Sequence, residues 1–284
     1  MIDKNNINIS LVLLILIIII SFLIKILSYK QPSQTYRIYY NKINNNILAD
    51  MSNYDLNIVE ASFFEKSDVE TIHQNNSKVI GYISLVEIGY WDDELIADLE
   101  ENDYLTDSNN KKIKSLDDKN YLGDLSSEHF QEILLKYIDK RILSKNMDGI
   151  FLDTLDWIDY YNSNIELQSK LLKGYKELLI KIKNRYPNIY IMQNRSLESY
   201  FSTSKNYISA ILWENFDSPF INTEKKSIIK FMKLFLYAKL YKTNVYIISF
   251  SNEGINRKLV KKMNWNYIFS QMENRYSKWD IIVR

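Results

Sequence analysis

Short apolar or β-branched runs recur along the chain, and a helical pattern follows most of them. Leu171, Leu178 and Ile182, for example, recur at steps that place them on one face of a helix. This alternation is typical of parallel strands joined by crossover helices. The predicted strands are Tyr36 to Tyr40, Leu56 to Glu60, Lys78 to Leu85, Gly149 to Leu155, Ile189 to Gln193, Tyr207 to Trp213, Asn244 to Ser249 and Asp280 to Val283. Eight such strands predict an α/β fold, a (β/α)8 TIM barrel.

A polar stretch interrupts the alternation. Asp92 to Lys119 lies between the third and fourth predicted strands and is longer than most barrel connections. We expect a surface excursion on the side where the strands end. The pattern leaves open whether this stretch is a lid over a substrate or an insert that does not touch one.

The N-terminal segment has a different pattern. Asn5 to Ile24 carries no charge and is mostly Leu, Ile and Val, and twenty helical residues at about 1.5 Å each cross a hydrocarbon core of roughly 30 Å. No small-residue cleavage site follows and no Cys is available for lipidation, so an uncleaved transmembrane helix is predicted. A buried helix of the globular body is the alternative. The predicted domains are residues 1–35, an anchor and linker, and residues 36–284, the barrel.

Composition excludes several kinds of chemistry. The chain has no Cys, and its two histidines, His73 and His129, are far apart, so a thiol nucleophile or a zinc site is not expected. Its six glycines form no nucleotide-binding loop, and no G-x-S-x-G elbow is present. The net charge of +1 argues against nucleic acid as a partner. Carboxylates remain as the reactive groups.

Acidic residues stand at the ends of four predicted strands: Glu60, Glu87, Asp153 and Glu214. Active sites of these barrels lie at the carboxyl ends of the strands, so four acids in register indicate a site, whereas one alone is more often a helix cap or a surface charge. Asp153 and Glu214 end strands that are two apart, which places the strand ends roughly 9 Å from each other, and inward-leaning side chains shorten this distance. That separation fits cleavage of a glycosidic bond but does not distinguish a retaining from an inverting mechanism.

More acidic and aromatic side chains follow Asp153, namely Asp156, Trp157, Asp159, Tyr160 and Tyr161. Clustered carboxylates raise one another's proton affinity, which lets one acid stay protonated while another is ionised. Aromatic faces beside acids suit a sugar site, because they stack on the C–H faces of a sugar and attract a cationic one. A structural role, with Asp156 capping the next helix, is an equal alternative for Asp156 and Asp159.

These segments are similar to a known family. They are Val79 to Glu87, Asn120 to Leu125, Met147 to Asp156, Gln193 to Arg195 and Trp213-Glu214. In them the sequence resembles glycoside hydrolase family 114, the endo-α-1,4-polygalactosaminidase-like barrels, and the resemblance extends from about Tyr36 to the C-terminus. One departure is Val86, where the family commonly has Gly, and the bulkier side chain would narrow the subsite.

The resemblance implies that Asp153 and Glu214 are the catalytic acids and that Glu87, Asp156 and Asn194 line the sugar site. Four more residues complete the predicted substrate-binding set: Glu60, Tyr82, Trp157 and Trp213. The implied reaction is hydrolysis of α-1,4-linked, galactosamine-rich and partly deacetylated exopolysaccharides, including those of biofilms. Two carboxylates suffice for this acid/base chemistry, so neither a metal nor a cofactor is expected.

A non-catalytic polysaccharide-binding barrel, associated with exopolysaccharide synthesis or export, is the alternative function. It would keep the aromatic side chains and lose one of the two acids, whereas Asp153 and Glu214 are both present. A structural membrane protein with a degenerate barrel is a third reading, and it would have no cleft. We expect a monomer whose partners are the polysaccharide and, through the N-terminal helix, the membrane.

The charges around the predicted membrane helix bear on its orientation. Lys25, Lys30 and Arg37 follow the helix, while only Asp3 and Lys4 precede it. By the positive-inside rule this distribution would place the barrel in the cytoplasm. The enzymes of the resembled family are secreted or lie at the cell surface. Against the charge count, we therefore predict a single-pass protein of the cell membrane with an extracytoplasmic catalytic domain.

Overall fold

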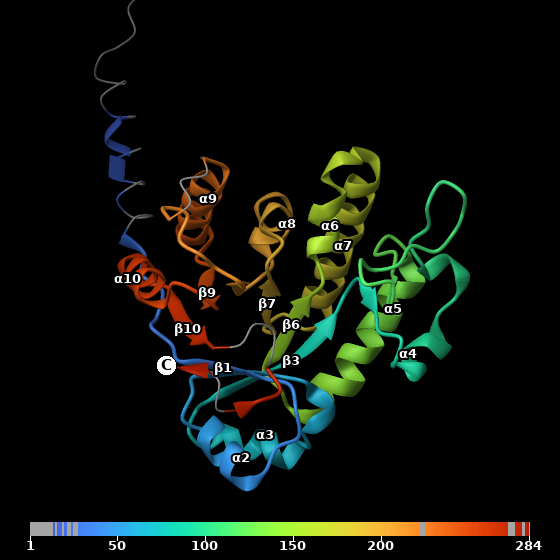
Figure 1. Ribbon diagram of the computed structural model, residues 1–284, viewed down its shortest axis with the longest axis horizontal. Coiled ribbons are helices and arrows are strands. Elements are labelled where there is room, and N and C mark those ends of the chain that lie inside the picture. The colour runs from blue at the N-terminus through green and yellow to red at the C-terminus, as the bar shows by residue number, and fades with distance from the viewer. Residues whose placement is uncertain are drawn as a thin grey trace, which may run out of the picture.

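The computed structural model describes residues 14, 16–18, 20–21, 24, 28–221, 225–271, 276–279 and 282–283. Eight parallel strands form one sheet in the order β1-β2-β3-β6-β7-β8-β9-β10. Their bounds are β1(Tyr36–Tyr39), β2(Leu56–Val59), β3(Lys78–Ser84), β6(Gly149–Asp153), β7(Tyr190–Asn194), β8(Ala210–Trp213), β9(Asn244–Ser249) and β10(Asn266–Ser270). The sheet curls into a nearly closed barrel (Figure 1), and the Gln34 amide beside β1 donates to Asn266 Oδ1 in β10 at 2.8 Å. The predicted barrel is confirmed.

Helices lie outside the barrel (Figure 1). Their bounds are α2(Asn45–Met51), α3(Lys66–His73), α4(Asp93–Asp98), α5(Glu128–Tyr137), α6(Asp156–Tyr160), α7(Ile165–Arg185), α8(Leu197–Ser202), α9(Lys225–Tyr241) and α10(Glu253–Met263), and a π-helical turn, η3(Ile138–Ile142), follows α5. The Asn164 side chain caps α7 by accepting the Leu167 amide at 3.1 Å. Leu171, Leu178 and Ile182 of α7 are buried, as their spacing predicts.

The eighth strand was assigned wrongly from the sequence. The predicted strand Asp280 to Val283 is not a barrel strand: Ile282–Val283 is β11, which pairs antiparallel with β10, and Asp280 and Ile281 lie outside the described residues. The eighth barrel strand is β10. Its apolar run, Tyr267 to Phe269, is only three residues long, as is the Ile-Ile-Val segment, so the pattern of apolar residues did not distinguish the two.

Apolar side chains at alternate strand positions fill the barrel interior. One from each strand is Ile38, Ile58, Ile80, Phe151, Met192, Leu212, Tyr246 and Ile268. Alternate side chains of a strand point the same way, so the residue two positions further on faces the same interior. On seven strands that residue is polar and stands toward the carboxyl end: Tyr40, Glu60, Tyr82, Asp153, Asn194, Glu214 and Ser270. Strand periodicity therefore gathers these side chains at one mouth of the barrel.

The stretch between β3 and β6 forms an ordered wall. We call residues 89–123 the excursion. It contains α4 and is closed by the antiparallel pair β4(Glu87–Ile88) and β5(Tyr121–Leu122). Arg141 of η3 donates two hydrogen bonds to Asp92, at 2.6 and 2.8 Å, which fixes the excursion beside α5 (Figure 1). The excursion lines a cavity that reaches the barrel mouth, which favours contact with a substrate over a remote insert.

The predicted membrane helix, Asn5 to Ile24, lies largely outside the described residues. Its described positions, 14, 16–18, 20–21 and 24, are helical. Among them Leu14, Ile17 and Ile24 are exposed. Within the described ranges, no helix has the length and apolar character needed to cross a bilayer. The anchor stays a prediction.

Candidate active site

The two predicted catalytic acids share one hydrogen-bond donor. Asn194 Nδ2 donates to Asp153 Oδ1 at 2.8 Å and to Glu214 Oε2 at 3.0 Å. Two oxygens bound to one amide nitrogen at these distances lie about 5 Å apart. Asn194 is only 6% exposed, and its Oδ1 atom has no hydrogen-bond partner within the described part of the chain. This oxygen is therefore available to accept a hydrogen bond from a ligand.

Burial raises the pKa of Asp153 above its ordinary value, and the charges of Glu214 and Asp156 raise it further. Hydrogen bonds from Asn194 and the Thr154 amide oppose that shift. Such opposing influences are typical of a pair that shares acid and base roles. The site therefore holds two carboxyl groups at close range, and burial raises the proton affinity of one of them, Asp153.

Tyrosines complete the barrel mouth. Tyr276 donates to Glu214 Oε1 at 2.5 Å, and Tyr82 forms a hydrogen bond with Asp153. Burial raises the pKa of both phenols well above their usual range, so both remain protonated donors. The Tyr40 ring packs between them, with ring centroids 5.2 Å from Tyr82 and 5.6 Å from Tyr276.

Glu87 is held beside this layer by neutral donors. Trp157 Nε1 donates to Glu87 Oε1 at 2.6 Å, and Asn120 Nδ2 donates to Glu87 Oε2 at 2.8 Å. The Thr154 hydroxyl accepts the Glu87 amide at 3.2 Å and the Val86 amide at 2.9 Å. Trp157 is thus a partner of Glu87, and most of its own side chain is buried.

The acids that follow Asp153 have different positions. Asp156 begins α6, is about half exposed and lies 3.9 Å from the Arg195 guanidinium. Asp159 is bound to the start of α8, where it accepts the Glu198 amide at 3.1 Å and the Ser199 amide at 3.0 Å. Asp159 therefore has the structural role that the sequence left as an alternative to sugar binding, because it caps the start of α8. Asp156 remains open to the cleft.

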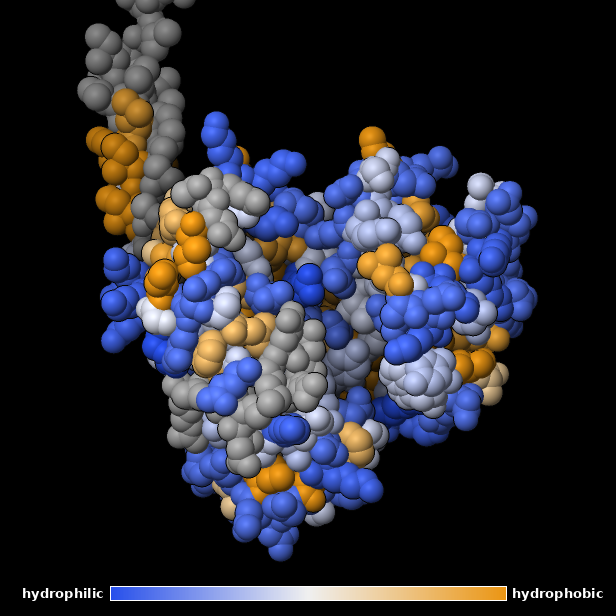
Figure 2. All heavy atoms as spheres, viewed as in Figure 1, coloured by the Kyte–Doolittle hydropathy of each residue, from blue (hydrophilic) through white to orange (hydrophobic). Residues whose placement is uncertain are grey.

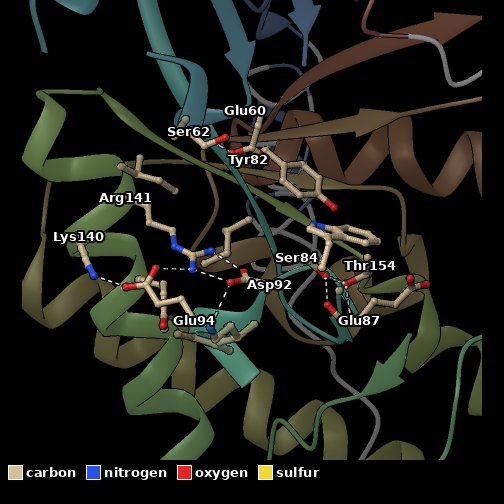
Figure 3. Close-up of a pocket in the computed structure, with 18 of the residues that line it drawn as sticks. Glu60, Ser62, Tyr82, Ser84, Glu87, Asp92, Glu94, Lys140, Arg141 and Thr154 are labelled. Carbon is tan, nitrogen blue, oxygen red and sulfur yellow. Dashed lines mark hydrogen bonds and ion pairs between the residues drawn. The ribbon is translucent and has the colours of Figure 1, made fainter. Parts of the chain in front are cut away.

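Two cavities flank the carboxylate pair. The larger, about 750 Å³, is lined by Glu60, Tyr82, Glu87 and the excursion, and Figure 3 shows Glu60 and the ion-paired Arg141 on opposite sides of it. The smaller, about 380 Å³, is lined by Asp156, Trp213 and Glu214 among others. Figure 2 shows that the surface is hollowed between the two halves of this face. The two cavities therefore lie on either side of the barrel mouth.

The backbone turns sharply after each central site residue. Thr154, Arg195 and Asn215, which follow Asp153, Asn194 and Glu214, have φ values of 64°, 47° and 53°. Non-glycine residues pay about 1–3 kcal/mol for such strained conformations, which persist mainly where function requires them. The strain coincides with the three side chains that form the bridged pair.

Several residues of the site were not predicted from the sequence. Tyr40 could have been predicted from the alternation of side chains along a strand, because it follows the interior residue Ile38 by two positions. Thr154 and Asn120 carried no signal of their own, since a loop hydroxyl or amide has many other uses. Tyr276 lies in the segment after β10, where no strand pattern predicts which way a side chain points.

No group of three or more His, Asp or Glu side chains within the described ranges is arranged to hold a metal ion.

Comparisons with known proteins agree with this geometry. The sequence model of the family described as Glycoside-hydrolase family GH114 matches residues 27–231. The glycoside hydrolase domain of PelA from Pseudomonas aeruginosa superposes with a TM-score of 0.68 at 15% identity, covering 86% of this chain and 96% of that chain. Ega3 from Aspergillus fumigatus, in complex with galactosamine, gives 0.62 at 14% identity, covering 89% and 96%. At such identities the superpositions show a shared fold. No curated protein matches the chain.

Proposed function

The chain belongs to glycoside-hydrolase family GH114, and from this premise we propose that it hydrolyses an α-1,4-linked, galactosamine-rich and partly deacetylated exopolysaccharide. The observation that carries the proposal is the pair Asp153 and Glu214, bridged by the single amide of Asn194 at a barrel mouth flanked by two cavities. A barrel that only binds polysaccharide has no need for two carboxylates at this spacing.

The spacing supports a retaining mechanism. Retaining glycosidases place their carboxyl groups about 5–5.5 Å apart and inverting ones about 6.5–9.5 Å apart, and the bridge through Asn194 corresponds to the shorter value. One carboxylate attacks the anomeric carbon while the other acid protonates the departing glycosidic oxygen. The glycosyl ester that forms is then hydrolysed by water, which the second residue deprotonates.

The charge distribution supports an amino sugar as substrate. In the larger cavity Asp92 and Glu94 are ion-paired with Arg141. Glu60 has no ion-pair partner within the described part of the chain, and it accepts only the Ser62 backbone amide, at 3.0 Å. A protonated amine on the sugar gains Coulombic attraction from Glu60, whereas Lys145, which lines the same cavity and donates to the Ala61 carbonyl at 2.8 Å, acts against it. An N-acetyl group has no such charge. The structure of Ega3 contains galactosamine, which agrees with this preference.

The direct test is hydrolysis by the full-length chain of partly deacetylated α-1,4-galactosaminan, with new reducing ends read by mass spectrometry. Asp153→Asn and Glu214→Gln should each lower turnover at least about a hundredfold, because each keeps the side-chain size and removes the proton transfer or the attack. Circular dichroism should show an intact fold. Wild-type turnover by either variant would sink the assignment.

Azide assigns the two roles. Without the nucleophile, azide attacks from the face the carboxylate used and yields an inverted glycosyl azide. Without the acid/base residue, azide replaces water in the second step and yields a retained one. The anomer formed with each variant, Asp153→Asn or Glu214→Gln, therefore identifies the residue that was removed.

For the N-terminal segment, residues 1–35, we propose an anchor that holds the barrel at the outer face of the cell membrane as a monomer. An uncharged run from Asn5 to Ile24 supports this, as does the exposure of Leu14, Ile17 and Ile24, whose side chains do not pack on the barrel. Such a helix suits lipid on all sides.

A further inference from the structure

The larger cavity extends well beyond the cleavage point. Its inner end is formed by Ser84 and Thr154, and Ser84 is the register partner of Asp153 in the neighbouring strand. Its outer wall is the excursion, which contributes Gly89 and Trp91. Figure 3 shows the ion-paired Arg141 securing that wall on the side opposite Glu60. Trp91 thus lines the same cavity as Ser84 and Thr154, the neighbours of Asp153.

Trp91 is exposed and yet held in position. Its side chain is 69% exposed, although burying an indole normally stabilises a protein. A Cβ atom built on Gly89 would lie 2.8 Å from both Cε2 and Cζ2 of Trp91, so the six-membered ring rests where only a glycine leaves room. Tyr90 meets the same ring edge-on, with centroids 4.9 Å apart at 83°. One side of the ring is therefore supported while much of its surface stays open.

We propose that Trp91 is a remote sugar-binding platform, which stacks on a sugar of the polymer at a distance from the bond that is cut. This inference rests on the proposed function and deepens it. Aromatic faces bind the C–H faces of sugars, and a protonated amine on the sugar adds cation–π attraction. Gly89 is a positioning residue for the platform. The excursion then serves as a fixed binding wall, since Arg141 and Asp92 hold it in place.

The proposal predicts a dependence on substrate length. A contact far from the reacting atoms is made equally in the ground state and in the transition state, so it changes KM and leaves kcat unaltered. On this proposal, a galactosamine trisaccharide that covers only the cleavage point does not reach Trp91. Long galactosaminan does. Loss of the platform should therefore raise KM for the polymer and leave KM for the trisaccharide unchanged.

The experiment compares KM and kcat of the full-length chain on both substrates. Trp91→Ala should raise KM for the polymer about three- to tenfold, with kcat and the trisaccharide constants unchanged. Gly89→Ala should have the same effect in weaker form, because it pushes the ring away, and Trp91→Phe should restore most of the affinity. The matched control is Leu116→Ala, an exposed apolar residue of the excursion that does not line the cavity, and it should leave both substrates unaffected.

An unchanged polymer KM in Trp91→Ala, or an equal rise on both substrates, would overturn the platform. Calorimetric binding of the polymer to Glu214→Gln, with and without Trp91→Ala, separates this outcome from failure of the proposed function. If the wild type does not cut the polymer but Trp91→Ala still weakens binding three- to tenfold, the platform stands and the hydrolytic assignment fails. If the Trp91→Ala change does not alter binding, the platform is wrong whatever the hydrolysis shows.

Discussion

Asn194 controls the chemistry of the site at the scale of single residues. Its one amide group holds both carboxylates, and its hydrogen bond lowers the proton affinity of Asp153, whose pKa burial raises. Without it, two close carboxylates face each other with no shared donor, and their mutual repulsion favours proton uptake. Asn194 therefore fixes the geometry of the pair and opposes the rise in the pKa of Asp153.

We predict that Asn194→Ala lowers kcat about 10- to 100-fold, because small displacements of reacting groups are costly. The limb of the pH profile of kcat/KM that Asp153 governs should also move to higher pH, since loss of this donor raises the pKa of Asp153; it is the acid limb for a nucleophile and the basic limb for a general acid. The control is Asn120→Ala, which removes a donor from Glu87 and not from the pair. A pH profile of Asn194→Ala in which neither limb moves would show that the bridge has no electrostatic role.

Substitution of Glu60 tests whether the site prefers a cationic sugar. We predict that at low salt Glu60→Gln raises KM for deacetylated galactosaminan about three- to tenfold and leaves the N-acetylated polymer unaffected. Added salt should shrink the difference by screening the charge. Glu94→Gln is the matched control, because Glu94 lines the same cavity but is ion-paired. Equal wild-type rates on the two polymers, or a preference for the acetylated one, would contradict the idea.

At the scale of elements, the excursion depends on a buried carboxylate. The hydrogen bond with Asp103, whose oxygen lies 2.7 Å from the ring nitrogen, raises the pKa of His129. Burial of Asp103 acts against ionisation, but hydrogen bonds from the Glu100 amide, Ser127 and His129 lower its pKa overall. The pair joins the excursion to the start of α5.

The sign of the pH effect follows from these shifts. The folded-state pKa of His129 is raised, so its contribution is complete below the unfolded value of about 6.5 and is lost as pH rises through the folded value. The contribution of Asp103 is lost only in acid, as pH falls through its lowered folded pKa. We predict that amide-exchange protection factors around Asp103 fall as pH rises from 6 to 9, and that His129→Gln removes this dependence. Protection that is independent of pH in the wild type would refute the coupling.

Strands differed in how far they could be predicted. The first seven barrel strands were predicted because each is an apolar run, and six of them are followed at period two by the residues of the mouth. The eighth, β10, was missed because its apolar run, Tyr267 to Phe269, is only three residues long and the C-terminal Ile-Ile-Val segment offered a run of the same length. Asn194 was predicted to line the site, but its bridging role depends on the curvature of the sheet, which brings β6 and β8 to either side of β7.

At the scale of the whole molecule, the N-terminal helix and the barrel have to be placed relative to the membrane. We predict that protease added to intact cells digests the barrel, because the proposed anchor leaves it outside. Protection until lysis would instead agree with Lys25, Lys30 and Arg37, whose charges favour a cytoplasmic barrel. A shorter product released into the medium would show that the segment is cleaved.

The measurement that tests the central claim most directly is proton NMR of the first products formed from α-1,4-galactosaminan by the full-length chain. Both hydrolysis and mechanism are read in one experiment, because the anomeric signal shows that a new reducing end exists and which configuration it has. The bridge through Asn194 predicts that the α-anomer appears first and converts to the β-anomer only by later mutarotation. A β-anomer at the earliest times, or binding of the polymer without any new reducing end, would contradict the account.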